Sequence, residues 1–255
     1  MNCRIMSTKA SPVIIIPARM AASRLPGKPL ADIAGKPMIR HVWERAMAAA
    51  VAPVWVATDD PDIAAVVRDA GGEAVLTRDD HPSGSDRTFE AVSLIDPDGR
   101  FDLVLNLQGD LPEMDTAIPA TLLHAATASG ADLTTLVTPA SDEEAARVQV
   151  VKAVVSWDDT GNVGRALYFS RSMVPHGDAP KWHHIGVYGW RRAALARFVT
   201  LPPSPLEKSE RLEQLRALEA GMRIAVAAID EAPAGVDTPE DLAATRARIL
   251  GRASG

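Results

Sequence analysis

The sequence predicts an α/β fold with a mostly parallel central sheet and helices on both of its faces. Two observations lead to this prediction. Short apolar runs alternate with segments of helical periodicity from residue 13 to residue 137, and strands that are apolar on both sides belong to sheets that helices cover on both faces. Parallel neighbours also need crossovers, which are right-handed, so the alternation indicates βαβ units.

The elements of the first half follow from this alternation. Apolar runs predict strands over residues 13–16, 53–58, 73–77, 101–107 and 132–137, and helical spacing predicts helices over 37–51, 61–70, 85–95 and 116–129. Pro37 stands where proline fits the first turn of a helix, and the pair Gly71 and Gly72 ends the second helix.

The rhythm changes after residue 138. Further apolar runs predict strands over 149–157, 166–170, 185–190 and 223–229, and helices are expected over 191–200, 205–220 and 238–250. The middle section is interpreted as an insertion whose strands return to the same sheet. We expect a disordered leader over 1–10, one domain over 11–250 and a tail over 251–255, the domain dividing into 11–138, the insertion 139–220 and a return to the core over 221–250.

Composition excludes several classes of protein. The 255 residues carry a net charge of −6, which disfavours a general electrostatic grip on nucleic acid. The longest apolar stretches, 12–17 and 46–57, are too short to cross a bilayer, so no membrane insertion is expected. The single cysteine excludes a disulfide scaffold and fits a cytoplasmic protein, and the leader has no apolar core like that of a signal peptide.

The loop 17–30 follows the first predicted strand and carries three cations. Arg19, Arg24 and Lys28 lie beside Gly27, which permits a close approach of the backbone. Ligands of open α/β sheets bind at the carboxyl ends of strands, and this set of groups suits a triphosphate. The glycine spacing of a Walker A loop is absent. The alternative is a solvated basic loop.

Two aspartates follow predicted strands. Asp110 follows the strand 101–107, and Asp237 precedes the last helix. Thr238 and Asp241 already form a capping box, which leaves the Asp237 side chain free. The two carboxylates therefore suit Mg²⁺ together with phosphate oxygens. The alternatives are a turn aspartate and a helix cap.

Other chemical motifs are weak or absent. His183 and His184 are adjacent, so on a strand they face opposite sides and cannot chelate one metal. The sequence contains no H-E-x-x-H, C-x-x-C or G-x-S-x-G motif, which argues against zinc hydrolase, thiol redox and α/β-hydrolase chemistry.

Several segments together resemble one enzyme family. The segments 17–30, 77–87, 108–110, 166–171, 184–189, 203–207, 212–216 and 235–242 come in the order seen in 3-deoxy-manno-octulosonate cytidylyltransferase, the CMP-Kdo synthetase family. The resemblance covers about residues 11–250. The loop alone indicates only a sugar-nucleotide transferase, and the middle segments narrow the resemblance to this family.

The resemblance implies a Rossmann-like nucleotidyltransferase fold and a Mg²⁺-dependent cytidylyltransferase. Such enzymes transfer the cytidylyl group of CTP to the sugar acid Kdo and release pyrophosphate, for lipopolysaccharide biosynthesis, and they form homodimers. Residues 11–138 would bind the nucleotide, and the insertion would hold sugar-site and dimer elements. The alternatives are a sibling enzyme for another nucleotide or another acid, such as 8-amino-Kdo or a nonulosonic acid, and a non-catalytic nucleotide-binding relative.

The resemblance also implies roles for single residues. Arg24, Lys28, Asp110 and Asp237 would be catalytic, the two aspartates as metal ligands. The nucleotide would contact Ala18, Arg19, Arg24, Lys28, Arg78 and Ser83, and the sugar acid would contact Arg19, Gln108, His184, Tyr188, Glu213 and Gln214. The chain departs from the family at two places: Leu111, with Glu113 nearby, replaces the usual glutamate, and Arg147-Val148-Gln149 replaces an asparagine-rich stretch.

Overall fold

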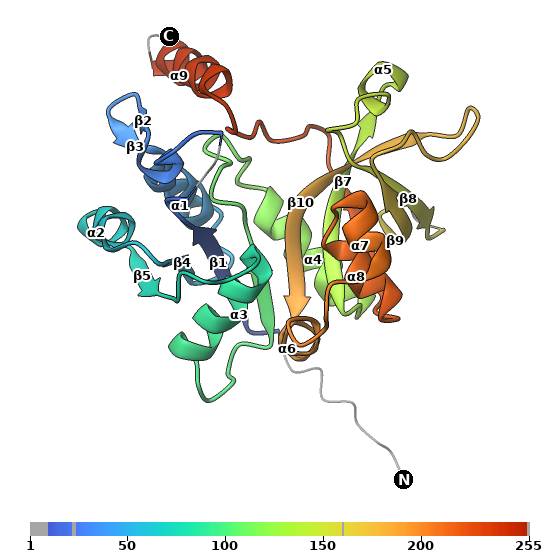
Figure 1. The fold of residues 1–255 in the computed structure, drawn as a ribbon, viewed down its shortest axis with the longest axis horizontal. Helices are drawn as coiled ribbons and strands as arrows, with labels where there is room; N and C mark the ends of the chain where they lie inside the picture. The colour runs from blue at the N-terminus through green and yellow to red at the C-terminus, as the bar shows by residue number, and fades with distance from the viewer. Residues whose placement is uncertain (1–9, 22–23, 160, 254–255) are drawn as a thin grey trace.

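A nine-stranded sheet forms the centre of the computed structural model, which describes residues 10–21, 24–159 and 161–253 (Figure 1). In spatial order the strands are β5 (Glu73–Leu76), β4 (Val54–Thr58), β1 (Pro12–Ala18), β6 (Leu103–Asn106), β10 (Lys181–Arg191), β7 (Leu133–Ala140), β11 (Ile224–Ala228), β9 (Val163–Ser170) and β8 (Lys152–Trp157). The predicted α/β class is therefore confirmed, and the expected leader lies outside the described residues except for Ala10.

The sheet is mixed. The strands β5, β4, β1 and β6 are mutually parallel, as the alternation predicts. Strand β10 then runs antiparallel between β6 and β7, and β9 runs antiparallel between β11 and β8. The strands of the middle section thus return to the same sheet, and β10 separates the two parallel groups.

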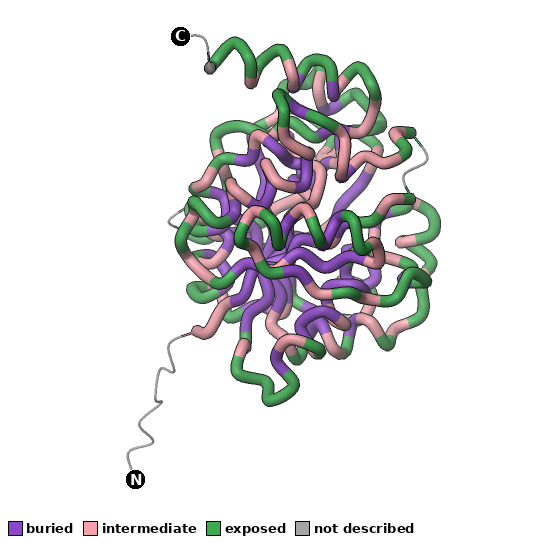
Figure 2. Tube along the Cα trace, turned by 90° about the vertical axis from the view of Figure 1, so that its left-hand side faces the viewer, coloured by how far each residue is buried: buried purple, intermediate pink, exposed green. Residues whose placement is uncertain are grey.

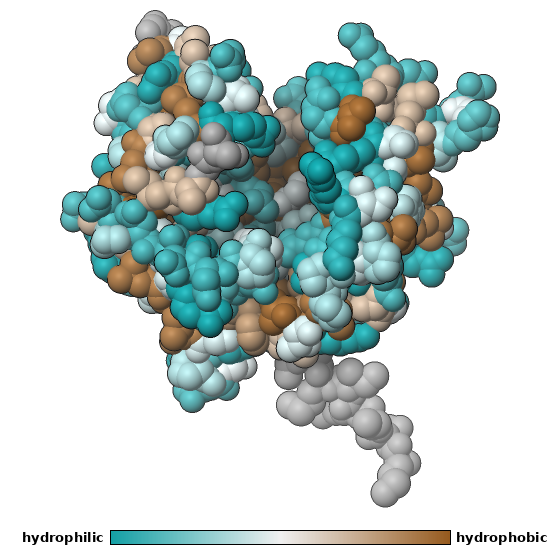
Figure 3. All heavy atoms as spheres, in the orientation of Figure 1, coloured by the Kyte–Doolittle hydropathy of each residue, from teal (hydrophilic) through white to brown (hydrophobic). Residues whose placement is uncertain are grey.

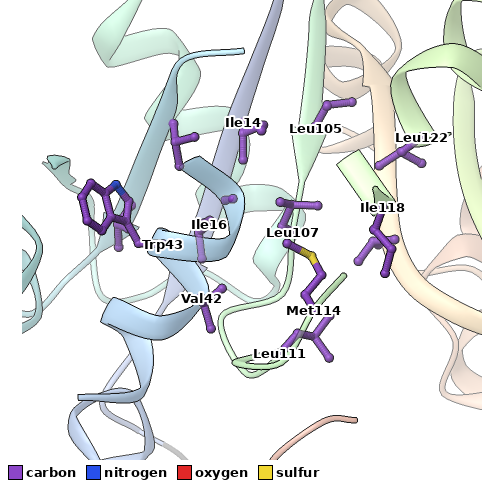
Figure 4. Close-up of a cluster of buried hydrophobic side chains, with 14 of the residues drawn as sticks. Ile14, Ile16, Val42, Trp43, Leu105, Leu107, Leu111, Met114, Ile118 and Leu122 are labelled. Atoms are coloured by element: carbon purple, nitrogen blue, oxygen red, sulfur yellow. The ribbon is translucent and has the colours of Figure 1, made fainter. Parts of the chain in front are cut away.

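The helices on one face cover the even-numbered residues of β1. Ile14 and Ile16 are fully buried in a cluster with α1 (Met38–Ala48), α2 (Pro61–Asp69) and α4 (Ile118–Ser129). Figure 4 shows this cluster, and the loop after β6 adds Leu111 and Met114 to it. That loop is therefore held by the core as well as by the strand before it.

The odd-numbered residues of β1 are buried on the other face. Val13 and Ile15 pack in a second cluster with α3 (Gly84–Ile95), α6 (Arg192–Phe198) and α8 (Gln214–Glu219). Figure 2 shows the buried residues running through the middle of the molecule between exposed outer turns. The alternation within one strand explains why both faces carry helices. None of the described helices is long and apolar enough to cross a membrane.

Four short elements were not predicted. They are η1 (Lys28–Leu30), the hairpin of β2 (Asp32–Ile33) with β3 (Lys36–Pro37), and α5 (Asp142–Ala145). Each is two to four residues long, which is too short for a periodic signal. The last helix, α9 (Pro239–Ala253), continues past the predicted end at residue 250 and includes the first three residues of the expected tail.

The prediction of one helix over 205–220 is wrong. The chain forms α7 (Pro205–Glu210) and α8, separated at Arg211, whose φ of 56° is left-handed. The break turns Leu212 into the core, where it is 6% exposed. Arg216 then pairs with Glu207 of α7 at 2.8 Å. The apolar spacing continues across the break, so periodicity alone could not show it.

Candidate active site

A cavity of about 320 Å³ lies at the carboxyl ends of β1 and β6. Figure 3 shows the surface hollowed between the two halves of the molecule. The cavity brings together most of the residues predicted for the nucleotide and the metal. Its lining includes Ala18, Arg19, Arg24, Lys28, Ser83, Gln108, Asp110 and Asp237.

Two cations of the loop after β1, Arg24 and Lys28, meet two carboxylates. Gly27 has a φ of 70°, which favours glycine, and the turn leads into η1, where Lys28 stands first. Lys28 Nζ donates to Asp110 Oδ2 at 2.8 Å and to Asp237 Oδ1 at 3.0 Å. Arg24 Nη2 lies 3.0 Å from Asp237 Oδ2. Three segments that are remote in sequence therefore meet at one ammonium group.

Burial and charge oppose each other at Lys28. Burial of the ammonium lowers its pKa, but the charges and hydrogen bonds of Asp110 and Asp237 outweigh this effect, so the pKa of Lys28 rises above its usual value. Lys28 is therefore a stable cation in the floor of the cavity.

The local structure before α9 explains why the Asp237 side chain is available. The Asp241 carboxylate accepts from the backbone N–H groups of Asp237 at 3.1 Å and Thr238 at 2.9 Å, and Thr238 Oγ1 accepts from the Asp241 N–H at 3.2 Å. The predicted capping box is thus confirmed. A backbone bond of 3.0 Å from Val236 N to Asp110 O ties the two aspartate loops together.

The two carboxylates fit a divalent metal whose other coordination positions are taken by phosphate and water oxygens. Two carboxylates converge on one cation, the Lys28 ammonium, so this point already attracts positive charge. Within the described parts of the chain, no group of three or more His, Cys, Asp or Glu side chains is placed to hold a metal. Mg²⁺ usually takes one or two carboxylates and keeps water or phosphate at its other positions.

The loop after β6 approaches the loop after β1 very closely. A Cβ atom built on Gly109 would lie 2.8 Å from the carbonyl oxygen of Pro17. Only glycine fits there, which explains why the residue between Gln108 and Asp110 is a glycine. Gln108 Nε2 donates to Gly186 O at 2.8 Å, so its amide joins the cavity to β10.

The amino-terminal turn of α3 forms another wall of the cavity. Ser83 is the N-cap of this helix, and its Oγ accepts from Asp86 N at 3.3 Å. Arg78, predicted near the nucleotide, is not in the lining; its exposed side chain pairs with Asp80 at 3.3 Å. The structure therefore brings Ser83 to the site and leaves Arg78 outside it.

Two further residues of the cavity, His81 and Arg87, lie in the segment 77–87 but were given no role from the sequence. Arg87 is 3% exposed, lies 3.0 Å from Asp59 Oδ1 and donates to Thr77 Oγ1 at 2.6 Å. His81 is also buried and bonds to Glu90. Both line the cavity. The available signal for Arg87 was its place four residues before Ala91, on the buried face of the predicted helix 85–95.

The remaining residues predicted for the sugar acid form a buried polar cluster beside the cavity rather than part of its lining. We call His184, Tyr188, Glu213 and Gln214 the polar cluster. Tyr188 Oη donates to Gln214 Oε1 at 3.4 Å, and Gln214 Nε2 lies 3.5 Å from His184 Nδ1. Ser85 Oγ donates to Glu213 Oε2 at 3.1 Å, which links the cluster to α3.

The positions of Glu213 and Gln214 differ from the prediction. The prediction places both residues inside one helix over 205–220, but Glu213 is the N-cap of α8, and Gln214 is its first residue and only 4% exposed. The break at Arg211 turns this segment inward. The expected opposition of His183 and His184 is confirmed, because His183 Nδ1 lies 2.8 Å from Glu144, whereas His184 Nδ1 lies 3.5 Å from Gln214 Nε2.

Burial sets the protonation of the polar cluster. It lowers the pKa of His184 to about 3, with a further contribution from His183, so the imidazole is neutral. Burial raises the pKa of Tyr188 and of Glu213, although Ser83 and Ser85 donate to the Glu213 carboxylate and oppose its shift. The cluster therefore offers neutral hydrogen-bonding groups and one carboxyl group.

Comparison with known proteins places this geometry in a family. Residues 13–224 match the family described as Cytidylyltransferase. The chain is 57% identical to the 3-deoxy-manno-octulosonate cytidylyltransferase of Parvibaculum lavamentivorans, covering 94% of this chain and 93% of the relative, and 55% identical to that of Methylobacterium radiotolerans, covering 95% and 98%.

A solved structure agrees with these relatives. The structure of CMP:2-keto-3-deoxy-manno-octonic acid synthetase complexed with CTP matches with a TM-score of 0.88 at 42% identity, covering 95% of this chain and all of the other. Sequence and structure thus lead to the same assignment. The chain belongs to the cytidylyltransferase family and, within it, to the 3-deoxy-manno-octulosonate cytidylyltransferases.

Proposed function

We propose that this protein transfers the cytidylyl group of CTP to 3-deoxy-D-manno-octulosonate and releases pyrophosphate, a step of lipopolysaccharide biosynthesis. The single observation that carries the proposal is the meeting of Lys28 with Asp110 and Asp237 at 2.8 and 3.0 Å in the cavity. The relatives named for this reaction, at 55–57% identity over nearly the whole chain, support it.

The reaction needs alignment and charge neutralisation rather than a protein nucleophile. A hydroxyl oxygen of the sugar acid attacks the α-phosphorus of CTP, the bond to the β-phosphate oxygen breaks, and pyrophosphate leaves with the electron pair. The hydroxyl proton goes to solvent. Lys28 and Arg24 lie where they can neutralise the triphosphate and the departing pyrophosphate. Ala18, Arg19 and Ser83 complete the proposed nucleotide contacts, whereas Arg78, which does not line the cavity, is not among them.

We assign Asp110 and Asp237 as the protein ligands of Mg²⁺. When bound, the metal would bind an α-phosphate oxygen and lower the pKa of the attacking hydroxyl. The loops that carry the two aspartates are already joined by the Val236–Asp110 backbone bond. Lys28 holds the two carboxylates in place and balances their charge.

The polar cluster is our candidate for the sugar-acid site, together with Arg19 and Gln108. The contact of Glu213 with Ser85 and that of Gln108 with Gly186 connect the cluster to the walls of the cavity. A site of buried hydroxyl, amide and imidazole groups discriminates strongly, because an analogue without the matching hydroxyls leaves these groups unpaired.

The insertion 139–220 is our candidate for the dimer elements. Four large apolar side chains of this region are exposed, namely Val148, Leu167, Met173 and Leu206. Exposed apolar side chains favour a protein interface where they form a patch, and we propose that a homodimer forms through this insertion. The substrate CTP and the low cysteine content favour a cytoplasmic location.

Pyrophosphate release tests the function. The wild-type protein is assayed with each of the four nucleotides and with Kdo, 8-amino-Kdo and nonulosonic acids. Turnover with CTP and Kdo supports the proposal, whereas preference for another pair identifies a sibling enzyme, and no turnover with any pair overturns an enzymatic role.

Carboxylate variants test the metal assignment. Asp110→Asn and Asp237→Asn should each lower kcat at least about 100-fold, because each removes a charged ligand. The exposed Asp98 supplies the control, and Asp98→Asn should keep wild-type turnover. Circular dichroism checks that the variants fold. Wild-type kcat for Asp237→Asn at limiting Mg²⁺ would remove Asp237 from the metal site.

A further inference from the structure

We propose that Glu113 is a positioning residue, which holds Asp237 in place by anchoring α9 to the loop that carries Asp110. The inference rests on the proposed function, since it concerns the two carboxylates assigned there to the metal. Glu113 does not line the cavity at the ends of β1 and β6. Any effect on the reaction therefore has to act through other residues.

The Glu113 carboxylate is buried between guanidinium groups of α9. Its side chain is 6% exposed, and its Oε2 lies 2.8 Å from Arg248 Nε and 2.6 Å from Arg248 Nη2. Its Oε1 lies 3.2 Å from Arg252 Nη1. Arg248 Nη2 also donates to Thr245 Oγ1 at 2.8 Å. Two nitrogens of Arg248 thus meet Oε2, whereas Oε1 accepts no hydrogen bond from the described residues and faces Arg252 only as an ion pair. Arg248 is therefore the main partner of this carboxylate, and its planar guanidinium orients the contact.

Few apolar contacts attach α9 to the rest of the fold. Figure 1 shows the helix at the edge of the molecule, reached by a long connection from β11. The small cluster beneath it contains Leu242 and Val236 with Ile33 and Met38. A helix held by so small a cluster depends on its polar anchors for its orientation.

Polar contacts hold α9 near its start and again in its second half, where Arg246 Nε donates to Asp32 O at 2.7 Å and Arg248 meets Glu113. Near the start of α9, the backbone bond from Val236 to Asp110 and the contact of Asp237 with Lys28 join the helix to the cavity. The Arg248 anchor lies roughly 14 Å further along, at 1.5 Å per residue from Pro239. The Arg246 bond and Ile249 attach the second half of α9 to the segment around β2, whereas Glu113 attaches it to the loop that carries Asp110. Loss of Glu113 would therefore let α9 shift relative to that loop and move Asp237 relative to Asp110.

Leu111 supports the loop between these anchors. It is 8% exposed within the core cluster, and its Cδ2 would lie 3.8 Å from a Cβ on Gly235. Leu111 thus joins the loop to the core by an apolar contact. The carboxylate of Glu113 meets Arg248 of α9.

The test measures metal dependence apart from turnover. CTP binding is measured by calorimetry without sugar acid over a range of Mg²⁺ concentrations, for wild type and Glu113→Gln. Glutamine keeps the shape and removes the charge. We expect the Mg²⁺ concentration for half-maximal CTP binding to rise about tenfold, as for the loss of residues that orient metal ligands. The conservative Glu113→Asp should stay closer to wild type.

A double-variant cycle tests whether Glu113 acts through α9. Arg248→Gln should raise the Mg²⁺ requirement as Glu113→Gln does, and the double variant should lose little more than either single variant. Additive losses would mean that the two residues act separately, and would overturn the proposal. If Glu113→Gln does not fold, the comparison of Arg248→Gln with Glu113→Asp carries the test.

A distant ion pair supplies the matched control. Arg192 Nη1 lies 2.6 Å from Oδ2 of the buried Asp96, at the carboxyl end of α3 and beside the start of β6, whereas the cavity lies at the other end of β6. Arg192→Gln should lower the melting temperature and leave the Mg²⁺ requirement unchanged. An unchanged requirement in Glu113→Gln, or an equal rise in Arg192→Gln, overturns the role of Glu113. A wild type that neither binds CTP nor releases pyrophosphate instead overturns the proposed function itself.

Discussion

Lys28 Nζ lies 2.8 Å from Asp110 Oδ2, although 82 residues separate them in the sequence. The two residues follow β1 and β6, which are paired in parallel, so their loops leave the sheet side by side. The contact places a permanent cation between the carboxylates assigned to the metal. The adjacency of the two strands is therefore what builds the site.

Lys28→Ala should lower kcat for pyrophosphate release by about 100-fold, with a smaller rise in KM for CTP. The reason is that Lys28 neutralises charge that grows on the leaving pyrophosphate, so its contribution increases in the transition state. Steady-state kinetics with CTP as the varied substrate measures the split. Arg24→Ala is the control, because the side chain of Arg24 is 67% exposed, and we expect a more even loss. A rise in KM alone for Lys28→Ala would assign this residue to ground-state binding.

Gly109→Ala should reduce turnover about tenfold or more and leave the protein folded. Its new Cβ would meet the Pro17 carbonyl oxygen at 2.8 Å, so the loops after β1 and β6 must move apart and carry Asp110 away from Lys28. Small displacements of catalytic groups are costly in rate. Gly235→Ala is the matched control, because its Cβ would make only an ordinary contact of 3.8 Å with Leu111. Equal activity of both variants would contradict the argument.

Gln214→Ala should raise KM for the sugar acid by the factor that corresponds to a loss of ~1–3 kcal/mol of binding free energy. KM for CTP should stay nearly unchanged. Gln214 bonds to Tyr188 and His184 inside the polar cluster, so its loss leaves buried groups without partners. Saturation curves for the two substrates on the same variant give the comparison. If both KM values match those of wild type, Glu213 and Gln214 lose their assignment to the sugar site.

The stability of the protein should fall as the pH decreases from 6.5. Burial lowers the pKa of His184 to about 3, against 6.5 in the unfolded chain. Between these two values the unfolded chain binds a proton that the folded chain does not, so acid favours unfolding. Binding of this proton to the unfolded chain lowers the free energy of unfolding by up to about 1.4 kcal/mol for each pH unit below 6.5.

Urea unfolding at pH 6 and pH 5 checks this dependence. His184→Gln should show a smaller loss of unfolding free energy over this interval than wild type does. His183 supplies the comparison within the same strand: burial lowers its pKa too, but the Glu144 carboxylate opposes the shift. His183→Gln should therefore change the dependence less. Equal slopes in wild type and His184→Gln would show that the His184 imidazole is not protected from protons.

The sequence determined those features that depend on neighbours in the chain. The alternation of apolar runs with helical segments gave the βαβ units, since a strand buried on both faces leaves a continuous apolar run. Thr238 and Asp241 predicted the capping box before α9, and this box leaves the Asp237 side chain without a capping role. The ordered motifs gave the family, because they preserve the spacing of the loops that meet at the sheet edge.

The tertiary structure decided those features that depend on residues distant in sequence. The antiparallel place of β10 between β6 and β7 follows from long-range pairing, which a strand pattern does not encode. The break at Arg211 is fixed by burial of Leu212 and by the pair of Arg216 with Glu207, although the apolar spacing continues through it. Arg87, on α3, and His81, just before this helix, lie at the cavity because α3 packs beside β1. A periodic pattern records which face of a segment is apolar, whereas a site depends on which remote groups that face brings together.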